Sequence, residues 1–251
     1  MNFNELAWAG FCFYYRSGGD KRYSSIMSDC YFLSQIRNHP ESIRLNEFEE
    51  KAILGYINIQ NYDLLVGHKL TENISIKLIS LKKELSFLQD LSLAECDLED
   101  KEVISAINQI YSELQVDGLW ITGASKIAHL LNEKLLPPIS LDIARHFGIQ
   151  HKGDITPWLK RIQWDIQEAI EDFNKMALEG TPSQYLSEKL GYSIGASGYE
   201  KSLAKFADEY YWLTYGDKLL IPPKWNPSLI IKDGLPEDRQ VVNTSHQEVS
   251  Q

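Results

Sequence analysis

Residues 156–179 read TPWLKRIQWDIQEAIEDFNKMALE, and this stretch predicts a helix of about six turns. It opens with Thr156-Pro157, and a threonine cap followed by proline at the first helical position is a typical start signal. The same signal recurs at Thr181-Pro182. No run of alternating apolar and polar residues is long enough to require a sheet. We therefore predict an all-α fold.

Apolar residues recur at helical spacing through most of the remaining chain. The expected elements are helices that start at Asn46, Thr71 and Asp100, two shorter elements at 122–132 and 139–147, and a last helix from Glu200 to Trp212. Pro137-Pro138 separates the two shorter elements, because proline breaks a helix. The apolar stretch from Leu6 to Tyr15 is expected to form a core helix or strand, since it is too short to span a bilayer.

This pattern predicts one helical domain over residues 1–221, with a lobe at about 97–180 that carries the motif described below. The composition changes from Pro222 onward, where three of the nine prolines fall within six residues and the end of the chain is polar. We expect residues 222–251 to form an extended arm that ends in a disordered tail.

Composition excludes several classes of function. The 251 residues carry a formal charge of −10, which argues against general coating of nucleic acid or of an anionic membrane but allows a local basic face. The three cysteines form no CxxC pair and the six histidines form no HExxH motif, so we expect no metal and no cofactor. Neither a targeting segment nor a membrane span is visible, and we expect a cytoplasmic protein without a membrane partner.

The most informative stretch for function is residues 117–149, DGLWITGASKIAHLLNEKLLPPISLDIARHFGI. We interpret it as a tight turn that contains Gly123, an amphipathic helix that starts at Lys126, a proline-marked loop, and a second short helix. From Leu119 to Ile162 there are six basic and three acidic residues, so this region has a charge of +3 while the remainder has −13. A basic face on an acidic protein is typical of a salt-sensitive nucleic-acid contact, and a solvated helix surface with a chance excess of lysine is the alternative.

The order of turn, lysine, apolar helix, proline and second helix resembles the helix-hairpin-helix DNA glycosylase superfamily. The resemblance covers about an eighth of the chain. It places the hairpin at Trp120–Ser125 and the lysine that attacks the sugar at Lys126. The run PPISLDIARHFGI resembles the family's segment in which proline is followed by aspartate and arginine, with Arg145 at the arginine position. Ser140 then stands where the family has aspartate, and Asp142 is the nearest carboxylate along the chain.

The resemblance implies an enzyme that flips a base out of duplex DNA and cleaves its N-glycosidic bond. The expected catalytic residues are Lys126, Asp142 and Ser140, although Ser140 also fits a helix cap and Lys126 a surface lysine. The expected DNA contacts are Thr122, Gly123, Ala124, Ser125, Arg145, Lys152, Lys160 and Arg161, and the expected base pocket is Trp120, His129 and His146. The alternative is a helical module without catalysis that binds nucleic acid or a protein partner. A basic loop with aromatic residues, FYYRSGGDKRYSS at 13–25, is a second candidate contact.

Overall fold

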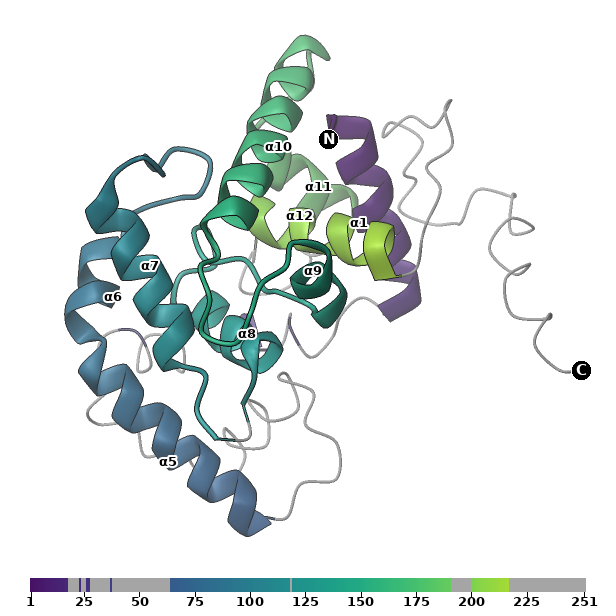
Figure 1. Ribbon diagram of the computed structural model, residues 1–251. Helices are drawn as coiled ribbons and strands as arrows, with labels where there is room; N and C mark the ends of the chain where they lie inside the picture. The colour runs from purple at the N-terminus through teal and green to yellow at the C-terminus, as the bar shows by residue number, and fades with distance from the viewer. Residues whose placement is uncertain are drawn as a thin grey trace, which may run out of the picture.

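The computed structural model describes residues 1–17, 23, 26, 27, 37, 64–117, 119–190 and 200–216. Every regular element in these ranges is a helix, which confirms the all-α prediction (Figure 1). The helices are α1 (Phe3–Ser17), α5 (Leu64–Ser80), α6 (Lys82–Leu88), α7 (Lys101–Glu113), α8 (Ile121–Leu131), α9 (Leu141–His146), α10 (Thr156–Lys175), α11 (Pro182–Lys189), α12 (Leu203–Tyr211) and the π-helix η2 (Trp212–Gly216). The predicted helix from Asn46 and the arm at 222–251 lie outside the described residues. Of the basic loop predicted at 13–25, residues 13–17 are helical and Tyr23 is buried, while residues 18–22, 24 and 25 also lie outside the described part of the chain.

The helices form two groups that α8 and α9 connect. α1, α10, α11 and α12 pack against one another, while α6 packs against both α5 and α7 (Figure 1). α8 contacts α7 on one side and α9 on the other, and α9 contacts η2, which continues α12. The two short helices that carry the sequence motif therefore lie at the centre of the arrangement.

Two of the predicted helix caps are confirmed here: the side chains of Asp100 and Thr181 accept hydrogen bonds from backbone N–H groups in the first turns of α7 and α11. The last helix, expected from about Glu200, begins at Leu203 with Ser202 as its cap. Two predicted starts are wrong. Thr71 lies inside α5, and Thr156 is already helical, with its N–H donating to the Asp154 carboxylate at 2.9 Å. Leu70, the residue before Thr71, and Ile155, the residue before Thr156, are both buried.

The apolar N-terminal stretch is a core helix. Phe3, Leu6 and Ala7 on α1 are fully buried, and the ring of Phe3 meets that of Phe173 edge-on at 4.8 Å between centroids. α10 supplies the opposite surface through residues at helical spacing, namely Trp158, Leu159, Ile162, Ile166, Ala169 and Phe173. The stretch from Leu6 to Tyr15, for which the sequence allowed a helix or a strand, is thus part of a helix that packs against α10.

The Phe173 ring tests this contact. We expect Phe173→Ala to lower the free energy of unfolding by about 3–5 kcal/mol, because the lost ring leaves a cavity beneath Phe3. The neighbouring Asn174 is exposed on the same helix, and Asn174→Ala is the matched control, with an expected change within about 0.5 kcal/mol. Urea unfolding of both variants measures the difference, and equal midpoints would contradict the packing.

Candidate functional site

The turn predicted before Lys126 is helical. α8 begins at Ile121, with Trp120 as its N-cap in extended conformation, and the N–H of Ala124 donates to the Trp120 carbonyl at 2.9 Å. Gly123 does not interrupt the helix, since one helical glycine costs only about 1 kcal/mol. A Cβ at position 123 would lie 2.3 Å from Cδ1 of Leu119, so Gly123 leaves the space that this side chain fills. The prediction of a hairpin turn at these residues is therefore wrong.

This shift changes which groups of the predicted DNA-binding turn are accessible. The first three N–H groups of a helix have no acceptor within it, and here they belong to Ile121, Thr122 and Gly123. Gly123, Ala124 and Ser125 are buried, and Thr122 is partly exposed. Only the first of the four predicted contacts is therefore accessible to a ligand through its side chain.

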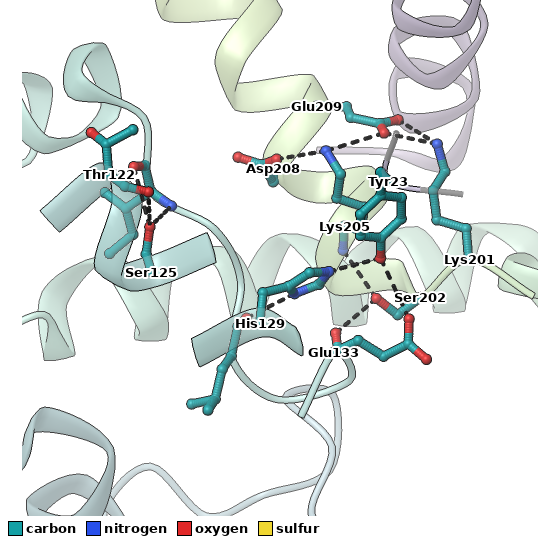
Figure 2. A network of polar contacts seen from close by, with 12 residues as sticks. Tyr23, Thr122, Ser125, His129, Glu133, Lys201, Ser202, Lys205, Asp208 and Glu209 are labelled. Atoms are coloured by element: carbon teal, nitrogen blue, oxygen red, sulfur yellow. Dashed lines mark hydrogen bonds and ion pairs between the residues drawn. The ribbon is translucent and has the colours of Figure 1, made fainter. Parts of the chain in front are cut away.

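Ser125 instead holds α8 against the segment that leads into α9. Its Oγ accepts a hydrogen bond from the N–H of Ile139 at 2.8 Å and lies 3.1 Å from the Thr122 carbonyl (Figure 2). Because Ser125 is fully buried, losing this acceptor would leave the Ile139 N–H unsatisfied. The hydrogen bond fixes the start of α9 beside the first turns of α8.

The predicted catalytic residues occupy three different settings. Ser140 caps α9, with its Oγ accepting from the N–H of Ile143 at 3.2 Å, which confirms the cap interpretation. Asp142 lies in the first turn of α9 with 45% of its side chain exposed, and its ion pair is with Arg145 at 3.7 Å. Lys126 is partly exposed on α8.

Two of the predicted DNA-binding cations are paired with acids of the protein itself. Lys160 Nζ lies 2.5 Å from Glu99. Arg161 donates to Asp165 at 3.0 Å and its guanidinium lies over the Trp164 ring. Asp165 is buried and also accepts a hydrogen bond from the Tyr211 hydroxyl. The charges of Lys160 and Arg161 are thus largely paired within the fold. The structure therefore does not support the prediction that these two residues contact DNA.

The other two cations lie on an exposed segment that we call the α9–α10 corner, residues 143–153. Arg145 and Lys152 are exposed there, as are His146 and His151. The corner contains no Asp or Glu. The ion pair of Arg145 with Asp142 is long and exposed, and such pairs contribute at most about 1 kcal/mol. The corner itself thus carries two cations, with Asp142 and Asp154 directly on either side of it.

The residues predicted to form a base pocket have different neighbours. Trp120 has 74% of its surface exposed, and its ring centroid lies 6.2 Å from that of His151. His146 stacks on Tyr215 with 3.8 Å between centroids. His129 is completely buried, so its prediction as a pocket residue is wrong.

His129 belongs to an internal polar network (Figure 2). One ring nitrogen, Nδ1, lies 2.8 Å from the Leu136 carbonyl, and the other, Nε2, lies 2.8 Å from the Tyr23 hydroxyl. A carbonyl only accepts, so Nδ1 carries the proton and Nε2 accepts from Tyr23. Burial, reinforced by the positive charge of Lys205, lowers the pKa of His129 to about 3. The ring is thus neutral and serves as a fixed hydrogen-bonding bridge.

Four buried charges lie next to this bridge on α12 and its N-terminal approach. Lys201 Nζ lies 2.8 Å from both carboxylate oxygens of Glu209, and Lys205 Nζ lies 3.0 Å from Asp208 and 3.4 Å from Glu209. Two cations and two anions balance, which offsets the cost of removing each from water. Spacings of three, four and eight residues in KSLAKFADEY hint at the pairs, but the sequence does not reveal their burial.

Searches against protein-family models, curated proteins and solved structures find no match to this chain. Within the described ranges, no three or more His, Cys, Asp or Glu side chains are grouped so that they could hold a metal ion. In the same part of the chain, no helix combines the length and hydropathy needed to cross a bilayer.

The neutral state of His129 predicts a specific loss of stability in acid. The unfolded chain gains a proton on this residue below about pH 6.5, while the folded protein does not until about pH 3, so the free energy of unfolding falls across that window. Between about pH 7 and about pH 5 we expect this residue to account for a loss of about 2 kcal/mol, which His129→Asn removes.

Urea unfolding at the two pH values measures this loss. His151→Asn, a change at an exposed histidine, is the control and should retain the pH dependence of the unchanged protein. An unchanged pH dependence in His129→Asn would show that the ring is not held neutral.

Proposed function

We propose that this protein binds nucleic acid through the α9–α10 corner. The observation that carries the proposal is that, in a chain with charge −10, Arg145 and Lys152 are exposed on a stretch that has no carboxylate of its own, with Asp142 directly beside it. A ligand with regularly spaced phosphates fits such a surface, because each cation that meets a phosphate releases a counterion.

The small number of cations in the corner determines how strongly the binding should depend on salt. With two phosphate contacts, the logarithm of the binding constant should fall with the logarithm of salt concentration with a slope of roughly −2. This is much weaker than the dependence of proteins that coat nucleic acid, and it is consistent with the acidic total charge. Most of the affinity must then come from contacts other than charge.

Base excision is a second candidate function, favoured by the hydrogen bond between Ser125 and Ile139. This bond holds the stretch that carries Lys126 beside the start of α9, where Asp142 is partly exposed. Cleavage of an N-glycosidic bond leaves the bonding pair on the departing base and positive charge on the sugar, which a carboxylate stabilises. Water then adds to the sugar carbon and gives up a proton to the departing base. Alternatively the Lys126 amine adds and loses a proton to the base, and an imine forms as the bond from that carbon to the ring oxygen breaks and the ring oxygen takes up a proton.

Charge reversal at the corner tests the binding. We expect the double variant Arg145→Glu, Lys152→Glu to lose at least roughly tenfold in affinity for a labelled oligonucleotide and to show almost no salt dependence. The control is Lys83→Glu, Lys101→Glu, which makes the same change in net charge at exposed first-turn positions of α6 and α7, where glutamate suits the helix dipole. Fluorescence anisotropy at several salt concentrations measures both, and equal losses would place the contact elsewhere.

Ser140 offers a sharp test of excision. Aspartate caps a helix as well as serine, so Ser140→Asp preserves α9 while it supplies the carboxylate of the glycosylase pattern. We expect this variant to release bases from duplexes with damaged or modified bases faster than the unchanged protein, and Lys126→Ala and Asp142→Asn to slow the reaction. Alkali treatment reveals the abasic sites. Release by none of the proteins would exclude this second function and leave the binding proposal intact.

A further inference from the structure

We propose that Trp120 and His151 form a clamp for an unpaired nucleobase, so that the partner class of the α9–α10 corner is single-stranded nucleic acid. This inference rests on the proposed function and deepens it. Its evidence is independent of the cations: an exposed indole, an imidazole with its centroid 6.2 Å away, and a tight backbone turn directly after the histidine.

Trp120 is exposed but anchored. Its side chain is the most exposed of the large apolar side chains in the described ranges, yet its chain neighbours Leu119 and Ile121 are both buried. Its own carbonyl accepts the first hydrogen bond of α8. The position of the indole is therefore fixed by the core and the helix on either side, while its ring lies in solvent. Burying an exposed tryptophan against a ligand gains much apolar area at little cost in side-chain entropy.

His151 is held by a strained turn. The next residue, Lys152, has a φ of +53°, a left-handed conformation that is uncommon for residues other than glycine. Its N–H donates to Oε1 of Gln115 at 3.2 Å, and Gln115 is buried between α7 and α8. At Gly153 a Cβ would lie 3.1 Å from the Gln150 carbonyl oxygen, so a side chain there would require the turn to shift by a few tenths of an ångström. Such strain persists only where the surroundings determine the conformation.

The spacing of the two rings suits a base between them. Their centroids are 6.2 Å apart and their planes are inclined by 51°, so they do not stack on each other. Two stacking steps along a nucleic-acid strand span about 6.8 Å, close to this separation. A rotation of the exposed imidazole by about 51° would make the two rings parallel on either side of a base. Lys152, next to His151, is then placed to meet the adjoining phosphate.

The chemistry of the corner favours an unpaired base over other partners. In a duplex the faces of the bases are already stacked, so an aromatic clamp reaches only bases that have left the helix or lie in a single strand. An acidic peptide would satisfy the cations but offers no flat ring. Stacking on aromatic residues tolerates any base, which predicts binding with little sequence preference.

The test compares three probes of equal length: a single-stranded oligothymidine, a duplex that contains the same strand, and a strand in which every base is replaced by an abasic sugar. The abasic strand keeps the phosphates and lacks the rings. We expect the unchanged protein to bind the oligothymidine roughly fivefold to a hundredfold more tightly than the abasic strand. Trp120→Ala should abolish this preference, Trp120→Phe should retain part of it, and His151→Ala should reduce it.

Controls separate this inference from the proposed function. Trp164→Ala removes another exposed tryptophan, on α10, and should leave the preference unchanged. Thermal unfolding followed by circular dichroism verifies that each variant folds. If Trp120→Ala binds all three probes as the unchanged protein does while charge reversal at the corner weakens them, the clamp is wrong and the proposed function stands. Binding to none of the probes would overturn both. An oligouridine shows whether the clamp accepts RNA as well as DNA.

Discussion

The ammonium group of Lys201 lies 2.8 Å from both oxygens of Glu209, and neither side chain is exposed to solvent. Removing either partner alone leaves a buried charge, at a cost of about 3–5 kcal/mol. α12 must therefore remain docked with its charged face inward. The ammonium group of Lys205 lies 4.7 Å from the ring of Phe13 on α1 and 5.4 Å from the ring of Tyr23. The buried cations therefore also position aromatic residues from the first part of the chain.

Helix α8 connects this group of buried charges to the surface of the protein. Tyr23 bonds to His129 near the carboxyl end of the helix, and the Leu136 carbonyl fixes the other side of the same ring. At the amino end, Ser125 holds the approach to α9, and Trp120 ends in solvent. One helix thus has a rigid buried end and a rigid exposed end. This explains how an indole with most of its surface in water keeps a defined direction.

The sequence predicts much of the fold, because helix periodicity and cap residues act locally. Asp100, Thr181 and Ser140 cap helices as their residue types suggest. The site was less predictable, since its properties depend on partners distant along the chain. The residues next to Lys160 in the sequence do not indicate that its side chain pairs with Glu99. His129 was expected in a pocket, and only the approach of Tyr23, 106 residues away, explains its burial.

Glycine at position 123 misled the prediction for a related reason. A glycine in this context suggests a turn, but here it makes room for Leu119, which folds back over the helix. From the sequence alone, a glycine that leaves space for a neighbouring side chain looks the same as a glycine that a turn requires for its backbone conformation. Two acids on α10 show the same limit: Asp165 and Asp172 share a face by their spacing, yet only the structure shows that Asp165 is enclosed by Tyr211 and Arg161.

The π-helix at Trp212–Gly216 follows α12 directly and brings Tyr215 onto the ring of His146. A π turn closes its hydrogen bonds over five residues where an α turn uses four, so it accommodates one residue more. If the turn became α-helical with its length unchanged, each later side chain would rotate by about 100° around the axis. Tyr215 would turn away from α9. The wide hydrogen bonding of η2 therefore sets the direction of Tyr215, and with it the contact between the end of α12 and the surface corner.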